Sequence, residues 1–379
     1  MIFLYFYLVY IKTEVNMKKL GTKYTGITSM AVFTVLLAAA LAGSGCKKSK
    51  TTTPMITTYG PSMQIVYLVS NVSGFGAANI DPNLVDAWGI AISPNGRLWV
   101  SSAQKGLTTI YDGTGATVLN PVTVSSATRG AAGAPTGVVY NGTTDFMIPS
   151  AGAAAKFIYA GGDGSVSGWS SGDSTVVVAT KSGAVYTGIA MANDGTGNFL
   201  YLANYGAGTI DVLDSKFNFV SGKSFSDPSI PTGFNPYNVV NIGGMLYVAY
   251  AAVPNGPFEI GGVNGYVNIF NPNGTLVKRF AGGTNLFSPW GITPAPDAMG
   301  LGSNMILVGN FLDGHISVYD ADGNYKGQLQ SGGTIITIDG LWALTEAPSG
   351  ASSLDQTAIY FAAGPQFETE GAVGYFKKQ

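Results

Sequence analysis

Two asparagines at equivalent places of a repeated pattern are the residues of this sequence best suited to chemistry. Asn204 and Asn310 each follow an apolar, strand-like segment, and each precedes an aromatic residue. Amide and carboxylate oxygens are the ligands that a hard cation such as Ca²⁺ prefers in proteins. The sequence therefore suggests a calcium site, whose candidate ligands are Asp86, Asn204, Asn310 and Asp339. The competing interpretation is that each asparagine caps a turn by hydrogen bonding to the local backbone.

Further carboxylates, amides and aromatic rings fall into the same connecting segments. Segments held by a rigid scaffold are the usual location of binding residues. The predicted ligand-binding residues are Asp86, Asn204, Tyr205, Asn238, Asn310, Phe311, Asp313, Asp339 and Glu368. The insertion Val253–Asn264 is expected to hang over the same face. No catalytic residue is predicted.

The other chemistry-bearing residues favour structural roles. His315 is the only histidine, and no Gly-x-Ser-x-Gly turn supports a Ser-His-Asp triad around it, so a solvated turn residue is the better interpretation. The segment 320–323 (DADG) resembles the start of an EF-hand loop, but Ser331 stands where that loop requires Glu. A hairpin turn is therefore expected there. The sequence also lacks a phosphate loop and a dinucleotide fingerprint.

A pattern that recurs roughly every fifty residues must position these side chains. Each copy opens with a short motif and continues with two more strand-like segments rich in β-branched and aromatic residues. The six openings are Trp88-Gly89, Thr136-Gly137, Thr187-Gly188, Tyr237-Asn238, Trp290-Gly291 and Trp342-Ala343. This period predicts an all-β fold, a six-bladed β-propeller with four-stranded antiparallel blades. Because the tryptophans recur with the period, packing is a better explanation for them than a sugar-binding platform.

The last copy lacks a fourth strand, since the chain ends soon after its third. The segment Gln64–Ser70 has a strand pattern and no blade of its own. We therefore expect it to pair beside Ala372–Phe376 and to close the ring, which removes exposed sheet edges.

The composition agrees with one neutral, turn-rich domain. Glycine contributes 53 of 379 residues, about twice its usual share, and charged residues are only 11%. A net charge of −2 argues against a nucleic-acid partner, which would require a basic face. A monomer is expected.

The amino-terminal region is expected to be a targeting segment. Residues 1–16 are interpreted as an upstream extension, residues 17–45 as a lipoprotein signal peptide, residues 46–61 as a lipidated cysteine with a flexible tether, and residues 62–379 as the propeller. Small residues precede Cys46, the only cysteine, as in the lipobox of bacterial lipoproteins. Lys47, rather than Asp, follows it, which favours an outer-membrane anchor. The alternative is an ordinary anchor helix with an incidental cysteine.

Five runs of sequence resemble a bacterial family of uncharacterised secreted β-propeller proteins. They are residues 81–94 (DPNLVDAWGIAISP), 203–212 (ANYGAGTIDV), 288–292 (SPWGI) with 309–314 (GNFLDG), and 338–342 (IDGLW). The resemblance covers the chain from about residue 67 to residue 376 and implies a six-bladed propeller similar to NHL-repeat and SMP-30-like folds. It implies no activity.

Two functions follow as hypotheses. The first is an envelope lipoprotein, anchored through Cys46, whose propeller face binds a small molecule or a protein. The alternative is a Ca²⁺-dependent hydrolase similar to SMP-30-like lactonases, acting at the central channel, where bound metal would activate water. A purely structural envelope protein is a third, weaker hypothesis, because polar residues gather at one face.

Overall fold

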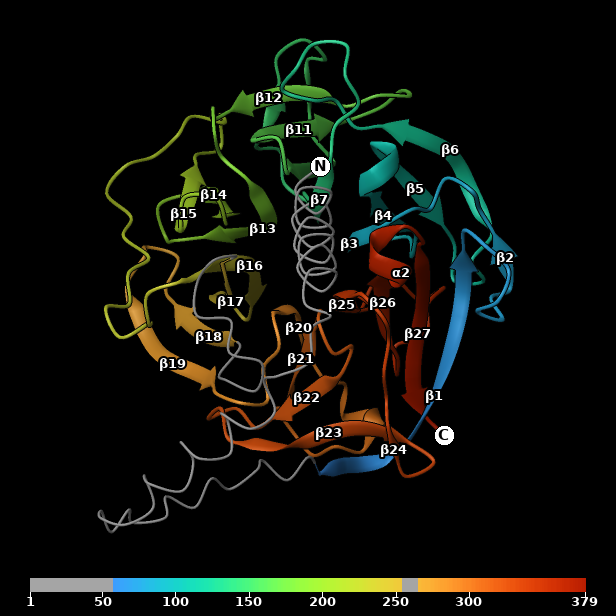
Figure 1. The fold of residues 1–379 in the computed structure, drawn as a ribbon. Coiled ribbons are helices and arrows are strands. Elements are labelled where there is room, and N and C mark those ends of the chain that lie inside the picture. Colours follow the sequence, from blue (N-terminus) through green and yellow to red (C-terminus); the bar gives the residue numbers. More distant parts are fainter. Residues whose placement is uncertain (1–56, 254–264) are drawn as a thin grey trace, which may run out of the picture. The chain divides into compact units, whose positions relative to one another are not determined.

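A computed structural model describes residues 57–253 and 265–379, which belong to one unit of the chain, residues 56–379. Cys46, the signal peptide and most of the Val253–Asn264 insertion lie outside the described residues. The regular secondary structure of the described chain is almost entirely β-strand (Figure 1).

Antiparallel sheets follow one another along the chain. The first four sheets consist of β3 (Ala87–Ile92), β4 (Leu98–Ser102), β5 (Leu107–Tyr111) and β6 (Thr117–Thr123); of β7 (Pro135–Tyr140), β10 (Phe157–Gly161), β11 (Ser165–Trp169) and β12 (Val176–Thr180); of β13 (Tyr186–Asn193), β14 (Asn198–Asn204) and β15 (Thr209–Leu213); and of β16 (Phe234–Ile242), β17 (Met245–Ala252), β18 (Gly265–Phe270) and β19 (Leu276–Gly282). The short strands β8 (Met147–Ile148) and β9 (Ala153–Ala154) form a separate pair.

The remaining strands join into one ten-stranded sheet. It contains β20 (Pro289–Pro294), β21 (Ile306–Asn310), β22 (Ile316–Tyr319), β23 (Tyr325–Ser331), β25 (Leu341–Glu346), β26 (Ile359–Ala363), β27 (Ala372–Lys378) and β1 (Thr58–Ser70), with the short β2 (Asn79–Ile80) and β24 (Thr334–Ile335) at its sides. The start of β1 pairs with β23, and the rest of β1 pairs with β27, so β1 joins two groups of strands.

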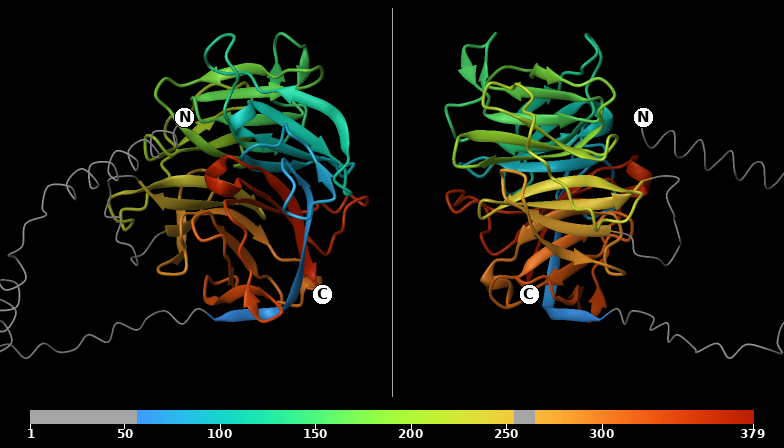
Figure 2. Two further views of the ribbon diagram at one scale, coloured as in Figure 1. Left: turned by 45° about the vertical axis from the view of Figure 1, so that its right-hand side comes forward. Right: turned by 90° about the vertical axis from the view of Figure 1, so that its left-hand side faces the viewer.

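The predicted closure of the ring is confirmed. Gln64 lies opposite Lys377 and Ser70 opposite Ala372 in an antiparallel register, and the two strands run side by side in Figure 2. The strand begins at Thr58, before the domain start predicted at residue 62. Both ends of the described chain are therefore held in the same sheet.

The first strand of each group lies innermost (Figure 1). Each of β3, β7, β13, β16 and β20 neighbours the next in this order, β20 neighbours β25, and β25 neighbours β3. The innermost strands therefore surround a common centre, as in a β-propeller, and the predicted propeller class is supported. The third sheet differs from the predicted four strands, because residues 220–233 form no outer strand beside β15. Pro228 and Pro231 lie in that segment, and proline cannot donate to a ladder.

Close approach of neighbouring inner strands explains the glycine of the repeated motif. A Cβ on Gly89 would lie 2.7 Å from the Thr136 carbonyl oxygen, and one on Gly291 would lie 2.7 Å from that of Trp342. Asn238 replaces this glycine in the fourth sheet, where its Nδ2 donates to the Trp290 carbonyl oxygen at 2.8 Å. The motif therefore reflects contact between inner strands.

We predict that Gly89→Ala destabilises the protein by about 1–3 kcal/mol, the usual cost of overpacking. The added methyl group meets backbone atoms of β7, which cannot rotate away. A thermal or urea melt measures the change. Gly197→Ala is the matched control, because the nearest atom to its new Cβ would be 3.9 Å away. Equal stability of the two variants would contradict the close-approach explanation.

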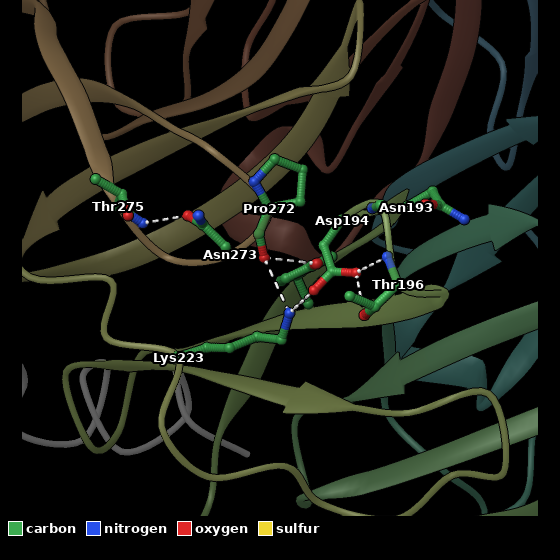
Figure 3. Close-up of polar contacts among 9 residues, drawn as sticks. Asn193, Asp194, Thr196, Lys223, Pro272, Asn273 and Thr275 are labelled. Carbon is green, nitrogen blue, oxygen red and sulfur yellow. Dashed lines mark hydrogen bonds and ion pairs between the residues drawn. The ribbon is translucent and has the colours of Figure 1, made fainter.

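A partly buried ion pair lies between the third sheet and the turn of the fourth sheet that contains Pro272 (Figure 3). Lys223 Nζ contacts Asp194 Oδ2, and the two side chains are 11% and 8% exposed. The ammonium also lies 4.0 Å from the centre of the Phe199 ring and 3.5 Å from the Pro272 carbonyl oxygen. Burial alone would raise the pKa of Asp194, but hydrogen bonds from Lys223 and Thr196 hold it well below its usual range.

Candidate functional site

Aromatic rings gather where three inner strands begin. Trp88 and Trp342 stack with ring centres 3.7 Å apart, and Trp290 meets both rings edge to face. Phe311 stacks on Trp342 with ring centres 4.0 Å apart, and the ring centre of Tyr237 lies 5.8 Å from that of Trp342. Aromatic packing was predicted for the tryptophans, and the structure agrees.

Two buried carboxyl groups adjoin this cluster. Asp86, just before β3, and Glu368, before β27, are 4% and 3% exposed. The Trp342 indole N–H donates to Asp86 Oδ1 at 3.3 Å. Glu368 Oε1 is buried and accepts no hydrogen bond within the part of the chain that the structure describes. We call Asp86, Trp88, Tyr237, Trp342 and Glu368 the aromatic–acid site.

Burial controls the protonation of both carboxyl groups. It raises the pKa of Asp86 to about 7, although the nearby Trp88 and Trp342 indole N–H groups oppose the rise; only that of Trp342 has hydrogen-bonding geometry. Burial, followed by repulsion from Asp86, raises the pKa of Glu368 to about 9. The pair therefore carries at least one proton near neutral pH. Burial and the charge of Glu368 also raise the pKa of Tyr237.

The backbone is strained at both acids. Asp86 has φ +55°, and the consecutive residues Gln366, Phe367 and Glu368 have φ of +54°, +56° and +67°. The segment α2 (Pro365–Glu368) is therefore not an ordinary right-handed helix over these residues. Such angles cost of order 1–3 kcal/mol for each residue and gather at functional sites. Phe367 is 89% exposed, so packing does not explain the strained segment.

Hydrogen bonds hold the strained segment in place. Asp339 Oδ2 accepts the Gln366 N–H at 2.9 Å, and the Thr369 hydroxyl donates to the Gln366 carbonyl oxygen at 2.7 Å. The Asp86 N–H donates to the Glu370 carbonyl oxygen at 2.9 Å. The two acids thus come from opposite ends of the domain sequence and meet because the ring closes.

A cavity of about 310 Å³ adjoins the aromatic cluster. The inner strands β3, β7, β13, β16, β20 and β25 line it, mostly with apolar side chains. Trp290 belongs to both the cavity wall and the aromatic cluster. This size and lining are typical of a small-molecule site.

The structure gathers only part of the predicted ligand-binding set. Asp86 and Glu368 form the acid pair. Phe311 packs against Trp342, and Tyr205 packs against Tyr237. Asp339 accepts a hydrogen bond from Gln366 in the strained segment. The residues that the sequence interpretation missed are Trp88, Trp342 and Tyr237, which were assigned to packing or to a strand opening. The signal that could have found them is the recurrence of a large aromatic ring at the first position of the repeated opening motif.

The other predicted residues have structural partners. Asn204 accepts the Val185 and Ala207 N–H groups, both at 3.2 Å, and donates to Asp211 at 2.9 Å, as the turn-cap interpretation expects. Asn238 links neighbouring inner strands. Asn310 is the last residue of β21, and its amide Nδ2 lies 3.4 Å from Oδ2 of Asp313 in the connection to β22.

No contact in the described structure joins any two of the four predicted calcium ligands. Among the described residues, no three His, Cys, Asp or Glu side chains form a group that could hold a metal ion. The calcium site therefore stays a prediction. No helix within residues 57–253 and 265–379 is long and apolar enough to span a membrane.

Comparison with known proteins places the chain among viral relatives. It is 36% identical over 345 residues to uncharacterized protein R648 of Acanthamoeba polyphaga mimivirus, covering 85% of this chain and 83% of that protein. Uncharacterized protein L690 of the same virus is 33% identical over 350 residues, covering 86% and 90%. The chain belongs to the same family as these two proteins. No protein-family model matches it.

One solved structure supports the fold. A protein of unknown function from Bacteroides thetaiotaomicron VPI-5482 has a TM-score of 0.53 and 12% identity, covering 84% of this chain and 77% of that one. Regucalcin from Agrobacterium tumefaciens, a calcium-binding protein, has a TM-score of 0.49 and 12% identity, covering 85% and 97%. Likeness at this level does not transfer calcium binding to this family member.

Proposed function

We propose that the protein is a six-bladed β-propeller lipoprotein that binds a cationic small molecule at the aromatic–acid site. One observation carries the proposal: two buried carboxyl groups in strained backbone lie beside stacked aromatic rings. Aromatic faces and carboxylates both attract organic cations. When a cation binds between the two carboxyl groups, they can release a proton, so that the positive charge of the cation replaces the charge of the proton.

Access requires a change at the site, because both acids are buried. The strained Gln366–Glu368 segment is the element whose rearrangement exposes Glu368. Trp290 connects the aromatic cluster to the cavity at the centre of the sheets, which offers room for the rest of a ligand.

The test is a titration of the full chain with choline and spermidine, followed by tryptophan fluorescence. Two of the five tryptophans belong to the site and Trp290 contacts both, so binding should change the signal. We expect affinity to rise between pH 6 and pH 9, since the cation binds the deprotonated pair. Glu368→Gln should weaken binding at least tenfold, whereas Glu370→Gln, in the same segment, should not. Affinity that is equal at both pH values would contradict the proposal.

The calcium-dependent hydrolase remains the alternative, without an observation that favours it. Adding millimolar Ca²⁺ in the same titration distinguishes the two. A saturable response that Asn204→Ala abolishes would favour the alternative, because Asn204 is a predicted calcium ligand and does not belong to the aromatic–acid site.

The proposed anchor makes a separate prediction. Cys46→Ser should move the protein from the detergent phase to the aqueous phase when a bacterial host expressing the full chain is extracted with Triton X-114. Loss of the acyl chains removes the membrane affinity that they supply. The matched control is Ser44→Ala, which leaves the thiol in place. A detergent-phase protein after Cys46→Ser would point to the alternative anchor helix.

A further inference from the structure

Three side chains, one from the last residue of β21 and two from the connection to β22, carry oxygen or nitrogen atoms that can coordinate a divalent ion. His315 Nδ1 lies 3.4 Å from Asp313 Oδ2, and Asn310 Nδ2 lies 3.4 Å from the same oxygen. Asn310 is fully buried, and its Oδ1 accepts no hydrogen bond within the described chain. His315 Nδ1 is also buried without a hydrogen bond there.

Backbone hydrogen bonds fix the connection. The Asn310 N–H donates to the His315 carbonyl oxygen at 2.9 Å, and the Gly314 N–H donates to that of Asn310 at 3.1 Å. The His315 N–H donates to Asp313 Oδ1 at 3.0 Å, which leaves Oδ2 facing the imidazole. Gly314 has φ +68°, and a Cβ there would lie 2.3 Å from the Ile338 carbonyl oxygen.

An ion pair between Asp313 and His315 explains only part of this arrangement. It leaves the buried Asn310 oxygen without a partner, which is costly for a polar atom. A half-turn of the Asn310 amide places its oxygen where Nδ2 now lies, 3.4 Å from Asp313 Oδ2 and 3.2 Å from the Asn285 carbonyl oxygen. After this rotation, Asp313 Oδ2 lies 3.4 Å from both the amide oxygen and the imidazole Nδ1, and a cation bound between the two oxygens would offset their repulsion.

We propose that Asn310, Asp313 and His315 bind a divalent transition-metal ion, with Zn²⁺ the best match. Zn²⁺ binds nitrogen and oxygen at about 2.0–2.2 Å with tetrahedral angles, so two of its ligands are separated by about 3.3–3.5 Å. The imidazole favours a transition metal over Ca²⁺. This site shares only Asn310 with the predicted calcium site and is independent of the aromatic–acid site.

Calorimetric titration of the chelator-treated full chain with Zn²⁺ tests the proposal. We expect one ion bound to this site, with affinity lowered at least tenfold by His315→Ala and by Asp313→Asn. Asp322→Asn, an exposed substitution in the next turn, should leave the affinity unchanged. Because Asn310→Ala could unfold the connection, Asn310→Asp is the better variant, and it should retain binding. Absence of binding, or binding that His315→Ala and Asp313→Asn do not change, would overturn the proposal.

Discussion

Glu368→Gln should make the protein more stable than the wild type at pH 9 and equally stable at pH 5. Glu368 is almost fully buried without a hydrogen-bond partner for Oε1 in the described chain, and burial raises its pKa to about 9. The folded state therefore holds a proton that the unfolded chain releases near pH 4.5. Glutamine has the shape of the neutral acid and has no proton to lose.

The sign of the pH dependence follows from this difference. Below the unfolded pKa both states are protonated, and the group does not oppose folding. As the pH rises toward the folded pKa, the unfolded chain binds fewer protons than the folded one, so the free energy of unfolding falls. Each unit of pKa difference corresponds to about 1.4 kcal/mol, and we expect a loss of a few kcal/mol.

Urea melts of both proteins between pH 5 and pH 9 measure this effect. The wild type should lose stability across that range, and Glu368→Gln should lose less. Glu370→Gln is the control, since it removes a carboxyl group from the same segment. A Glu368→Gln protein that is less stable at every pH would mean that Glu368 is charged and stabilised in the native state.

Much of the fold could be predicted from local patterns. The repeated opening motif predicts the inner strands, and four of its six copies contain a glycine at which the neighbouring backbone leaves too little room for a Cβ. The pairing of Gln64–Ser70 with the last strands followed from a strand pattern without a partner. The repeat predicts an outer strand in the third sheet, and the structure has none there. The repeat reflects the three inner positions of each sheet, whereas proline in the fourth position prevents backbone hydrogen bonding at the sheet edge.

The candidate site could be predicted only in part. Asp86 and Glu368 were both among the candidates, but nothing local pairs them, because they meet only when the first and last sheets adjoin. The left-handed angles of Gln366, Phe367 and Glu368 had no sequence signal, since none of these residues is glycine or asparagine. Tertiary contacts impose those angles, so they cannot be predicted from the periodic pattern of the sequence.

Lys223→Met should destabilise the protein by about 2 kcal/mol, between the values typical of exposed and of fully buried ion pairs. The substitution leaves Asp194 charged and only 8% exposed, with hydrogen bonds from Thr196 but no cation. It also removes the ammonium group that lies over Phe199 and near Pro272, so the contact between the third and fourth sheets weakens (Figure 3). Urea melts at pH 7 measure the loss.

Three comparisons separate the ion pair from ordinary packing. Adding Asp194→Asn to Lys223→Met should restore part of the stability, since the buried charge is then gone. Lys326→Met breaks the more exposed pair with Asp320 and should have a much smaller effect. Because the pKa of Asp194 is lowered in the native state, the ion pair stabilises the fold above the unfolded pKa, and this contribution is lost as the pH falls. A loss that the second substitution does not reduce, and that is the same at low pH, would assign the effect to the lysine side chain's packing.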